Sequence, residues 1–145
     1  MNVIEAPSPN FDPRTAPPDI LVLHYTGMQT GEEALTRLRD PQAKVSAHYM
    51  VEEDGRIFRL VAEERRAWHA GVSFWKGERN INDVSIGIEI VNPGHEFGYR
   101  PFPDAQIAAV TMLVGDIRTR WQIDNGRIVG HSDVAPERKD DPGEL

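Results

Sequence analysis

The feature that most constrains the fold is a short unbroken apolar run, Ile20–Leu23, followed directly by a histidine. Continuous runs of branched aliphatic residues are typical of strands buried on both faces of a sheet. A second predicted strand covers Val84–Val91 (VSIGIEIV). The length of 145 residues suits one domain with a hydrophobic core. We therefore predict a single domain over residues 1–145, built around a buried sheet.

Helix and strand patterns alternate along the rest of the chain. The further predicted elements are a helix over residues 30–39, a β-hairpin over 45–61 with its turn at Asp54-Gly55, a helix over 103–121 and a strand over 127–130. This order predicts a mixed sheet with helices packed against it, which is an α/β fold.

The remaining segments predict irregular structure. Residues 1–19 hold five of the eleven prolines and predict an extended N-terminal arm that lies on the domain. Residues 62–84 contain two of the three tryptophans and predict a long functional loop. Residues 92–100 and 131–145 are also expected to be loops.

Charge and hydropathy exclude several functions. A net charge of −7 argues against general nucleic-acid binding and against docking on anionic membranes, because both need clustered Lys and Arg. No apolar run approaches the roughly 20 residues of a membrane span. The first residues lack the basic and apolar regions of a signal peptide. We expect a cytoplasmic monomer, or a periplasmic one if a leader has been removed.

The chain has no cysteine, so any metal site must use histidine and carboxylate ligands. His24 and His131 each follow a predicted strand, and Asp141 lies ten residues after His131. Two imidazoles and one carboxylate are a common ligand set for catalytic zinc, with water in the fourth position. The spacing alone does not force these residues together, so solvated histidines at strand ends remain the alternative.

Five ordered blocks carry a family resemblance. They are Leu23-His24-Tyr25-Thr26, Val45-Ser46-Ala47-His48-Tyr49, Ala67-Trp68-His69-Ala70-Gly71, Asn82-Asp83 with Ser85-Ile86-Gly87-Ile88-Glu89, and His131-Ser132-Asp133-Val134-Ala135-Pro136 with Arg138-Lys139 and Asp141-Pro142-Gly143. Together they resemble the type-2 N-acetylmuramoyl-L-alanine amidases, which share a fold with the peptidoglycan recognition proteins. The nearest likeness is to bacterial amidases of cell-wall recycling and turnover.

The resemblance implies a mixed central sheet flanked by helices and one Zn²⁺ per chain. It implies that His24, His131 and Asp141 are the metal ligands. It also implies that Glu89 is the general base and that Lys139 stabilises the oxyanion. Some relatives use a tyrosine where this chain has Ala47, which supports Glu89 as the proton shuttle. Taken alone, Glu89 also fits an outward-facing strand position, and Lys139 also fits a simple ion pair.

Other residues in or near the blocks are expected to contact substrate. They are Tyr25, Trp68, His69, Ala70, Arg79, Asn92 and Ser132. Arg79 lies one position away from an arginine that relatives use for the stem-peptide carboxylate, and Asn80 occupies the matching place. His48 is expected to be a structural histidine, and His95 a solvated one.

The resemblance predicts hydrolysis of the amide between the lactyl group of N-acetylmuramic acid and L-alanine. The expected substrate is a muropeptide or peptidoglycan, with the 1,6-anhydro sugar favoured. Two alternatives stay open. One is a binding module that holds peptidoglycan without cutting it, and the other is a zinc peptidase that acts on the stem peptide.

Overall fold

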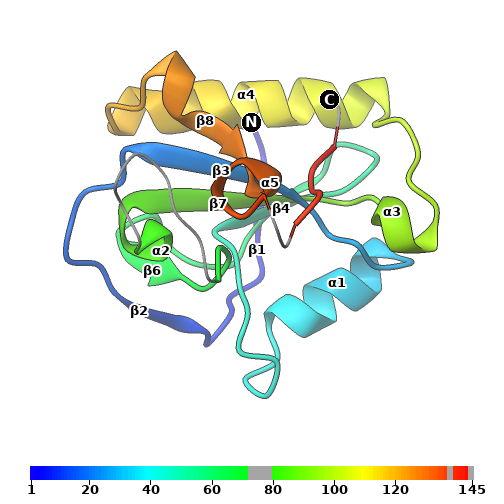
Figure 1. Cartoon of the computed structure of the whole chain (residues 1–145), viewed down its shortest axis with the longest axis horizontal. Helices are drawn as coiled ribbons and strands as arrows, with labels where there is room; N and C mark the ends of the chain where they lie inside the picture. Colours follow the sequence, from blue (N-terminus) through cyan, green and yellow to red (C-terminus); the bar gives the residue numbers. More distant parts are fainter. Residues whose placement is uncertain (72–79, 137–138, 144–145) are drawn as a thin grey trace.

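The computed structural model describes residues 1–71, 80–136 and 139–143. A six-stranded mixed sheet forms the centre, in the order β1-β5-β4-β7-β3-β8 (Figure 1). Its strands are β1 Val3–Glu5, β3 Ile20–Tyr25, β4 Tyr49–Val51, β5 Ile57–Arg59, β7 Ser85–Ile90 and β8 Ile128–Gly130. A second sheet pairs β2 (Phe11–Pro13) with β6 (Arg65–Ala67).

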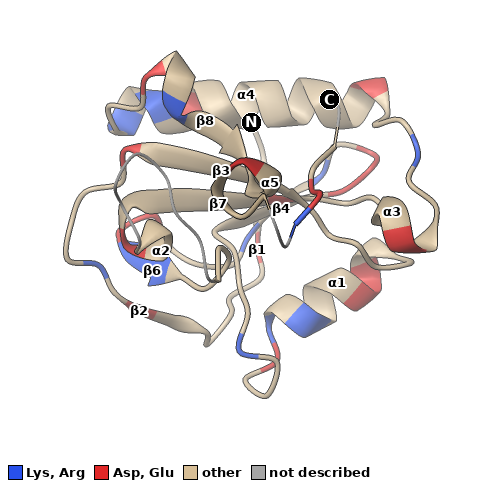
Figure 2. Cartoon of the chain, in the orientation of Figure 1, with Lys and Arg blue, Asp and Glu red and all other residues tan. Residues whose placement is uncertain are grey.

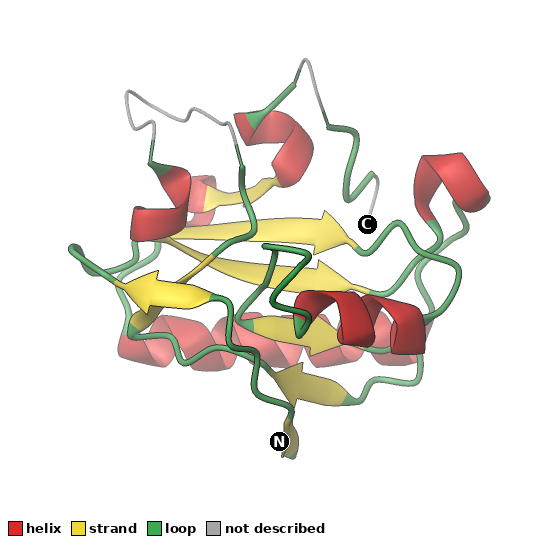
Figure 3. Ribbon diagram, turned by 90° about the horizontal axis from the view of Figure 1, so that it is seen from below, coloured by secondary structure: helices red, strands yellow, loops and turns green. Residues whose placement is uncertain are grey.

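Helices cover both faces of the central sheet (Figure 3). The described helices are α1 Gly31–Leu38, α2 Ile81–Val84, α3 Gly94–Phe97, α4 Asp104–Arg120, a 3-10 turn Asn125–Arg127 and α5 His131–Val134. The long helix α4 lies along one face, and α1 lies on the opposite side (Figures 1 and 3). The predicted α/β architecture, a mixed sheet flanked by helices, is confirmed.

Strands β3 and β7 each present one face to α4 and the other face away from it. Leu21, Leu23 and the isoleucines of β7 at positions 86, 88 and 90 pack with α4 in the largest hydrophobic core. Ile20 and Val22 instead pack with residues of α2 and α5. Because side chains alternate along a strand, His24 and Glu89 point away from α4.

Local sequence explains several of these elements. The Thr30 hydroxyl caps α1 by accepting a hydrogen bond from the Glu33 amide at 3.1 Å. The predicted hairpin is confirmed, with β4 and β5 antiparallel. Gly55 in its turn has φ +94°, a conformation that glycine adopts without a Cβ penalty.

Three segments expected to be loops contain regular structure. Residues 62–84 contain β6 and α2, residues 92–100 contain α3, and residues 131–145 begin with α5. Strand β6 forms because it pairs with β2 in the N-terminal arm, a partner more than fifty residues away that no local pattern reveals. The arm is extended at β1 and β2, and both strands are paired with the rest of the domain.

Charged residues lie mainly on the helices and connecting segments (Figure 2). The central strands β3 and β7 contribute a single one, Glu89. A carboxyl group in the middle of a buried sheet needs a functional or structural reason, because burial penalises its charge. None of the described helices combines the length and hydrophobicity needed to span a bilayer.

Candidate metal centre

Three elements bring His24, His131 and Asp141 together. His24 lies near the end of β3, His131 begins α5 directly after the neighbouring strand β8, and Asp141 lies in the C-terminal segment. The Nδ1 atoms of the two histidines are 3.0 Å apart. Oδ2 of Asp141 lies 3.2 Å from Nδ1 of His24 and 3.4 Å from Nδ1 of His131. These residues form a cluster able to hold a metal ion.

The separations within this cluster match a tetrahedral ion. Bond lengths of about 2.0–2.2 Å to zinc place tetrahedral ligands about 3.4 Å apart. The three observed distances, 3.0, 3.2 and 3.4 Å, lie close to that value. Three protein ligands leave a fourth position for water or substrate, as in catalytic rather than structural zinc sites.

Protonation also favours metal binding. Burial lowers the pKa of His24, because the charged imidazolium is penalised where water is excluded. Burial raises the pKa of Asp141, but its close contacts with His131 and His24 outweigh this and hold the pKa below its usual value. A neutral imidazole and an ionised carboxylate are the forms that bind cations.

Helix α5, which begins at His131, and the C-terminal segment that carries Asp141 are joined by hydrogen bonds. The Ser132 amide donates to the carbonyl of Asp141 at 2.9 Å. The Lys139 amide donates to the carbonyl of Ala135, also at 2.9 Å. A Cβ atom at Gly130 would lie 2.7 Å from Cδ of Pro142, so the close packing of these segments needs glycine there.

Glu89 is the neighbour of His24 in the sheet. The two residues are register partners on the parallel strands β3 and β7, so their side chains leave the same face. Glu89 is only 8% exposed, and its Oε2 atom has no hydrogen-bond partner among the described residues. Burial raises its pKa well above the ordinary value, and repulsion from Asp141 adds to this.

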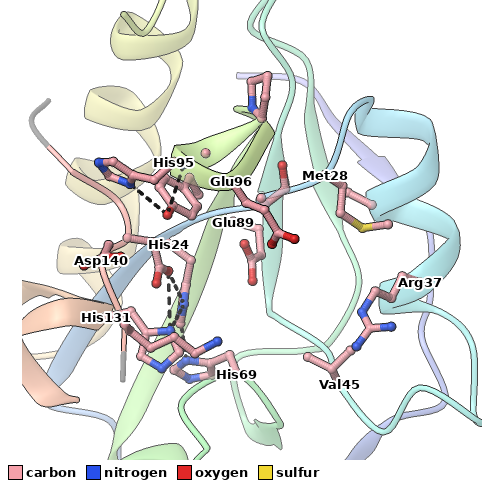
Figure 4. A pocket seen from close by; sticks show the side chains of 18 of the residues that line it. His24, Met28, Arg37, Val45, His69, Glu89, His95, Glu96, His131 and Asp140 are labelled. Carbon is pink, nitrogen blue, oxygen red and sulfur yellow. Dashed lines mark hydrogen bonds and ion pairs between the residues drawn. The ribbon is translucent and has the colours of Figure 1, made fainter. Parts of the chain in front are cut away.

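A cavity of about 410 Å³ opens over these residues. Figure 4 shows His24 and His131 on one side, Arg37, Met28 and Val45 on the other, and Glu89 between them. The first side presents metal-binding and proton-transfer groups. The second side, formed by α1 and its flanking segments, offers apolar surface and one guanidinium. The pocket can therefore hold a polar substrate across a metal ion.

The residues predicted from sequence occupy different places around this pocket. His24, His131, Asp141, Glu89 and Lys139 all line it, and so do Tyr25 and His69. Trp68, Ala70, Asn92 and Ser132 do not line it, and Arg79 lies outside the described residues. Asn92 is fully buried and bonds the Arg100 carbonyl and the Gly94 amide through its side chain.

The other two histidines differ sharply in surroundings. His48 is fully buried, accepts a hydrogen bond from the Gly87 amide at 3.0 Å and contacts the Arg65 carbonyl at 2.9 Å. His95 is exposed, lies 2.9 Å from the Tyr25 hydroxyl and stacks on Tyr99. His48 thus belongs to the core, whereas His95 lines the pocket rim.

Sequence reasoning missed several residues in and around the site, and Ser85 and Arg37 are two examples. Ser85 lies beneath the metal cluster, where its hydroxyl is 3.0 Å from Nε2 of His69. The signal was present as the alternation Ser85, Gly87, Glu89, which places all three on one face of β7. Arg37 lines the far wall, and nothing in its helical pattern distinguishes it from a solvated arginine.

Comparison with known proteins places the chain in a family. Residues 14–144 match the family model described as N-acetylmuramoyl-L-alanine amidase. The chain is 43% identical over 138 residues to N-acetylmuramoyl-L-alanine amidase AmiD of Escherichia coli K12, covering 87% of this chain and 49% of AmiD. It is 39% identical over 157 residues to 1,6-anhydro-N-acetylmuramyl-L-alanine amidase AmpD of Haemophilus influenzae, covering 94% of this chain and 83% of AmpD.

A solved structure of E. coli AmiD in complex with the substrate anhydro-N-acetylmuramic acid-L-Ala-D-γ-Glu-L-Lys has the same fold. Its TM-score is 0.80 at 41% identity, covering 88% of this chain and 53% of that one. The chain thus spans about half the length of AmiD. It is a member of the N-acetylmuramoyl-L-alanine amidase family.

Proposed function

We propose that this chain is a zinc-dependent amidase that separates N-acetylmuramic acid from L-alanine in muropeptides. The observation that carries the proposal is the joint presence, in one pocket, of a cluster of three candidate ligands and the buried carboxyl group of Glu89, whose Oε2 atom has no hydrogen-bond partner among the described residues. A module that only binds peptidoglycan has no need to bury a carboxyl oxygen that no other described residue satisfies. Membership of the amidase family supports the same reaction.

The choice of zinc follows from the ligands. Two imidazole nitrogens and one carboxylate oxygen at tetrahedral separations suit zinc better than calcium or magnesium, which prefer six or more oxygen ligands. A zinc ion held by His24, His131 and Asp141 would polarise the scissile carbonyl and lower the pKa of a bound water.

The remaining chemistry belongs to two side chains. Glu89 accepts a proton from the attacking water and delivers it to the nitrogen of L-alanine as the carbon–nitrogen bond breaks. Its raised pKa suits both steps, because the carboxyl must take up and release a proton near neutral pH. Lys139, which lines the same pocket, stabilises the negative charge that develops on the carbonyl oxygen. The products are the lactyl carboxylate of the sugar and a peptide with a free amino group.

We propose a 1,6-anhydro-muropeptide as the substrate. The H. influenzae relative is named for the 1,6-anhydro sugar, and the E. coli AmiD structure contains an anhydro-N-acetylmuramyl tripeptide. The cavity of about 410 Å³ extends from the metal cluster to α1, so a substrate larger than the scissile amide group can lie in it.

Digestion of anhydro-N-acetylmuramyl-L-Ala-D-γ-Glu-L-Lys tests the reaction directly. The zinc-loaded protein should release the intact tripeptide and anhydro-N-acetylmuramic acid, as identified by mass spectrometry. Cleavage within the tripeptide would show that the chain is a peptidase and not an amidase. Binding without cleavage would make the chain a peptidoglycan-binding module. A parallel digestion of intact sacculi distinguishes soluble fragments from the polymeric wall as substrate.

Metal content is tested separately. His24→Ala should lose both the bound zinc and the activity, as measured by elemental analysis and turnover. Glu89→Gln should keep one zinc per chain and lose turnover only. Equal loss of zinc in both variants would make Glu89 a ligand or a structural residue rather than a base.

A further inference from the structure

A chain of hydrogen bonds runs beneath the metal cluster from β7 to His24. Nε2 of His24 lies 3.0 Å from Nδ1 of His69. Nε2 of His69 lies 3.0 Å from the Ser85 hydroxyl, which in turn lies 2.6 Å from the carbonyl of Ile81. Ser85 is fully buried and His69 is 5% exposed, so water does not substitute for these contacts.

The Ile81 carbonyl, at the end of this series of hydrogen bonds, determines which nitrogen of His69 and of His24 carries the ring proton. A carbonyl oxygen only accepts, so the Ser85 hydroxyl donates its one proton to Ile81. The hydroxyl oxygen must then accept from His69, which places the His69 ring proton on Nε2 and leaves Nδ1 as an acceptor. His24 therefore donates from Nε2 to His69, and its Nδ1 atom carries a lone pair. That lone pair faces Oδ2 of Asp141, where a metal ion would lie.

Packing on β7 allows His69 to occupy this position. Ser85 and Gly87 leave the same face of the strand. A Cβ atom at Gly87 would lie 2.4 Å from Cγ of His69, so the imidazole rests where a larger side chain would stand. On this face of β7, Ser85 therefore bonds the His69 ring, Gly87 leaves room for that ring, and Glu89 contributes the carboxyl group of the site.

The residue that follows His69, Ala70, orients the second candidate ligand, His131. The Ala70 carbonyl accepts from Nε2 of His131 at 2.8 Å, which leaves Nδ1 of His131 directed at the cluster. The side-chain oxygen of Asn82 accepts from the amides of both His69 and Ala70, at 3.1 and 2.9 Å. One two-residue segment, His69-Ala70, is thus held in place and contacts both imidazoles.

We propose that Ser85 and His69 act together as positioning residues that hold His24 in the tautomer with its ring proton on Nε2, so that Nδ1 remains open to the metal. The inference rests on the metal site of the proposed function. His131 needs no such relay, because a backbone carbonyl cannot change its role. For His24 the acceptor is another imidazole, whose two tautomers are nearly equal in energy until Ser85 selects one.

Zinc affinity of Ser85→Ala tests the relay. Without the hydroxyl, the His69 proton is free to move to Nδ1, where it opposes the His24 tautomer that binds metal. We expect the zinc dissociation constant, measured by competition with a chromophoric chelator, to rise about 10- to 100-fold. An unchanged dissociation constant in the folded variant would overturn the relay.

Ser46→Ala is the matched control. Ser46 is also fully buried, and its hydroxyl also donates to a carbonyl, that of Asn10 at 2.5 Å, and accepts an amide, that of Trp68 at 2.9 Å. Its loss should lower stability and leave the zinc affinity of the folded protein unchanged. An equal loss of zinc affinity in both variants would show a general effect of weakened packing and would contradict the relay.

His69→Asn provides a rescue. The asparagine oxygen accepts from His24 and does not depend on Ser85 for its role. Adding Ser85→Ala to His69→Asn should therefore cause no further loss of zinc affinity, whereas Ser85→Ala in the wild-type background should. Additive losses in the double variant would contradict coupling through His69.

Nitrogen-15 spectra of histidine-labelled wild-type protein need no variant. We expect the proton of His69 on Nε2 in the zinc-loaded protein, with Nδ1 as an acceptor. A proton on Nδ1 of His69 would overturn the relay even if the enzyme is active. Conversely, a protein with the expected tautomers and bound zinc that leaves muropeptides uncut would contradict the proposed reaction and leave the relay intact.

Discussion

The two faces of strand β7 differ in composition, although they alternate residue by residue along the same six positions. The face toward α4 carries Ile86, Ile88 and Ile90, all fully buried in the main core. The opposite face carries Ser85 and Gly87, which contact the His69 ring, and Glu89, which lines the pocket of the candidate active site. One face therefore contributes the hydrophobic free energy of folding, and the other carries groups whose burial opposes it.

This division has a physical basis. Burying an isoleucine side chain stabilises a fold by about 1.5–3 kcal/mol, whereas an uncompensated buried carboxylate is costly. The stability that a functional face gives up must be supplied by other parts of the fold. In β7 the isoleucines on the face toward α4 contribute stabilising hydrophobic burial, whereas their immediate neighbours in sequence, on the other face, serve the candidate site. Variants on the two faces should therefore separate activity from stability.

The largest expected effect is on catalysis by Glu89→Gln. Loss of the proton-transferring group should lower kcat by about 10²–10⁴-fold, because general acid–base catalysis contributes that much. Zinc content and the far-ultraviolet circular dichroism spectrum should match wild type. Steady-state kinetics on an anhydro-muropeptide measure the change, and a kcat within a few fold of wild type would remove Glu89 from the mechanism.

On the α4 face, Leu113→Ala should act on stability alone. Leu113 is fully buried in the core against β3 and β7. Its truncation should lower the free energy of unfolding by about 2–5 kcal/mol, as measured by urea denaturation. The folded variant should bind zinc with unchanged affinity, since the ligands leave the other face. A parallel loss of zinc affinity would show that the two faces are coupled.

The pH dependence of stability provides a finer test. In the metal-free protein the pKa of Glu89 is raised well above 4.5, by burial first and by Asp141 second. The stability linked to the protonated carboxyl is fully present below the unfolded-state pKa of about 4.3. It is lost as the pH rises through the higher folded-state pKa.

Glu89→Gln cannot ionise, so its unfolding free energy should fall less steeply than that of wild type as the pH rises from the unfolded-state pKa of about 4.3 through the folded-state pKa of Glu89. Urea titrations of both metal-free proteins from about pH 5 to about pH 8 measure the difference. Parallel pH profiles would mean that Glu89 titrates normally in the folded protein.

The smallest effect is expected for Ile88→Val, one position before Glu89 and on the other face. Loss of one methylene from a fully buried position should cost about 0.5–1.5 kcal/mol of stability. At saturating substrate, kcat should equal that of wild type, because the backbone and the site face are unchanged. A clear fall in kcat would show that packing against α4 positions the carboxyl of Glu89.

Much of the fold followed from local patterns. The apolar run before His24 predicted β3, the Asp54-Gly55 turn predicted the β4–β5 hairpin, and the amphipathic stretch after Pro103 predicted α4. Hydrogen bonds within a helix or across a tight turn join residues near in sequence, so a short window contains the information. By contrast, β6 was expected to be loop, because its partner β2 lies far away in the N-terminal arm.

The site divides in the same way. Ordered sequence blocks, read as a resemblance, identified the candidate ligands and Glu89. Only the folded chain brings His24 and His131, 107 positions apart, to a separation of 3.0 Å between their Nδ1 atoms. Only the folded chain places Ser85 under His69.

What the sequence by itself determined was therefore the set of chemical groups and most of the elements that carry them. The tertiary structure decided the register that puts His24 beside Glu89 and the hydrogen bonds that assign each imidazole its proton. The reason is physical: residue type and periodicity act over a few positions, whereas register and tautomer depend on packing between segments far apart in the chain.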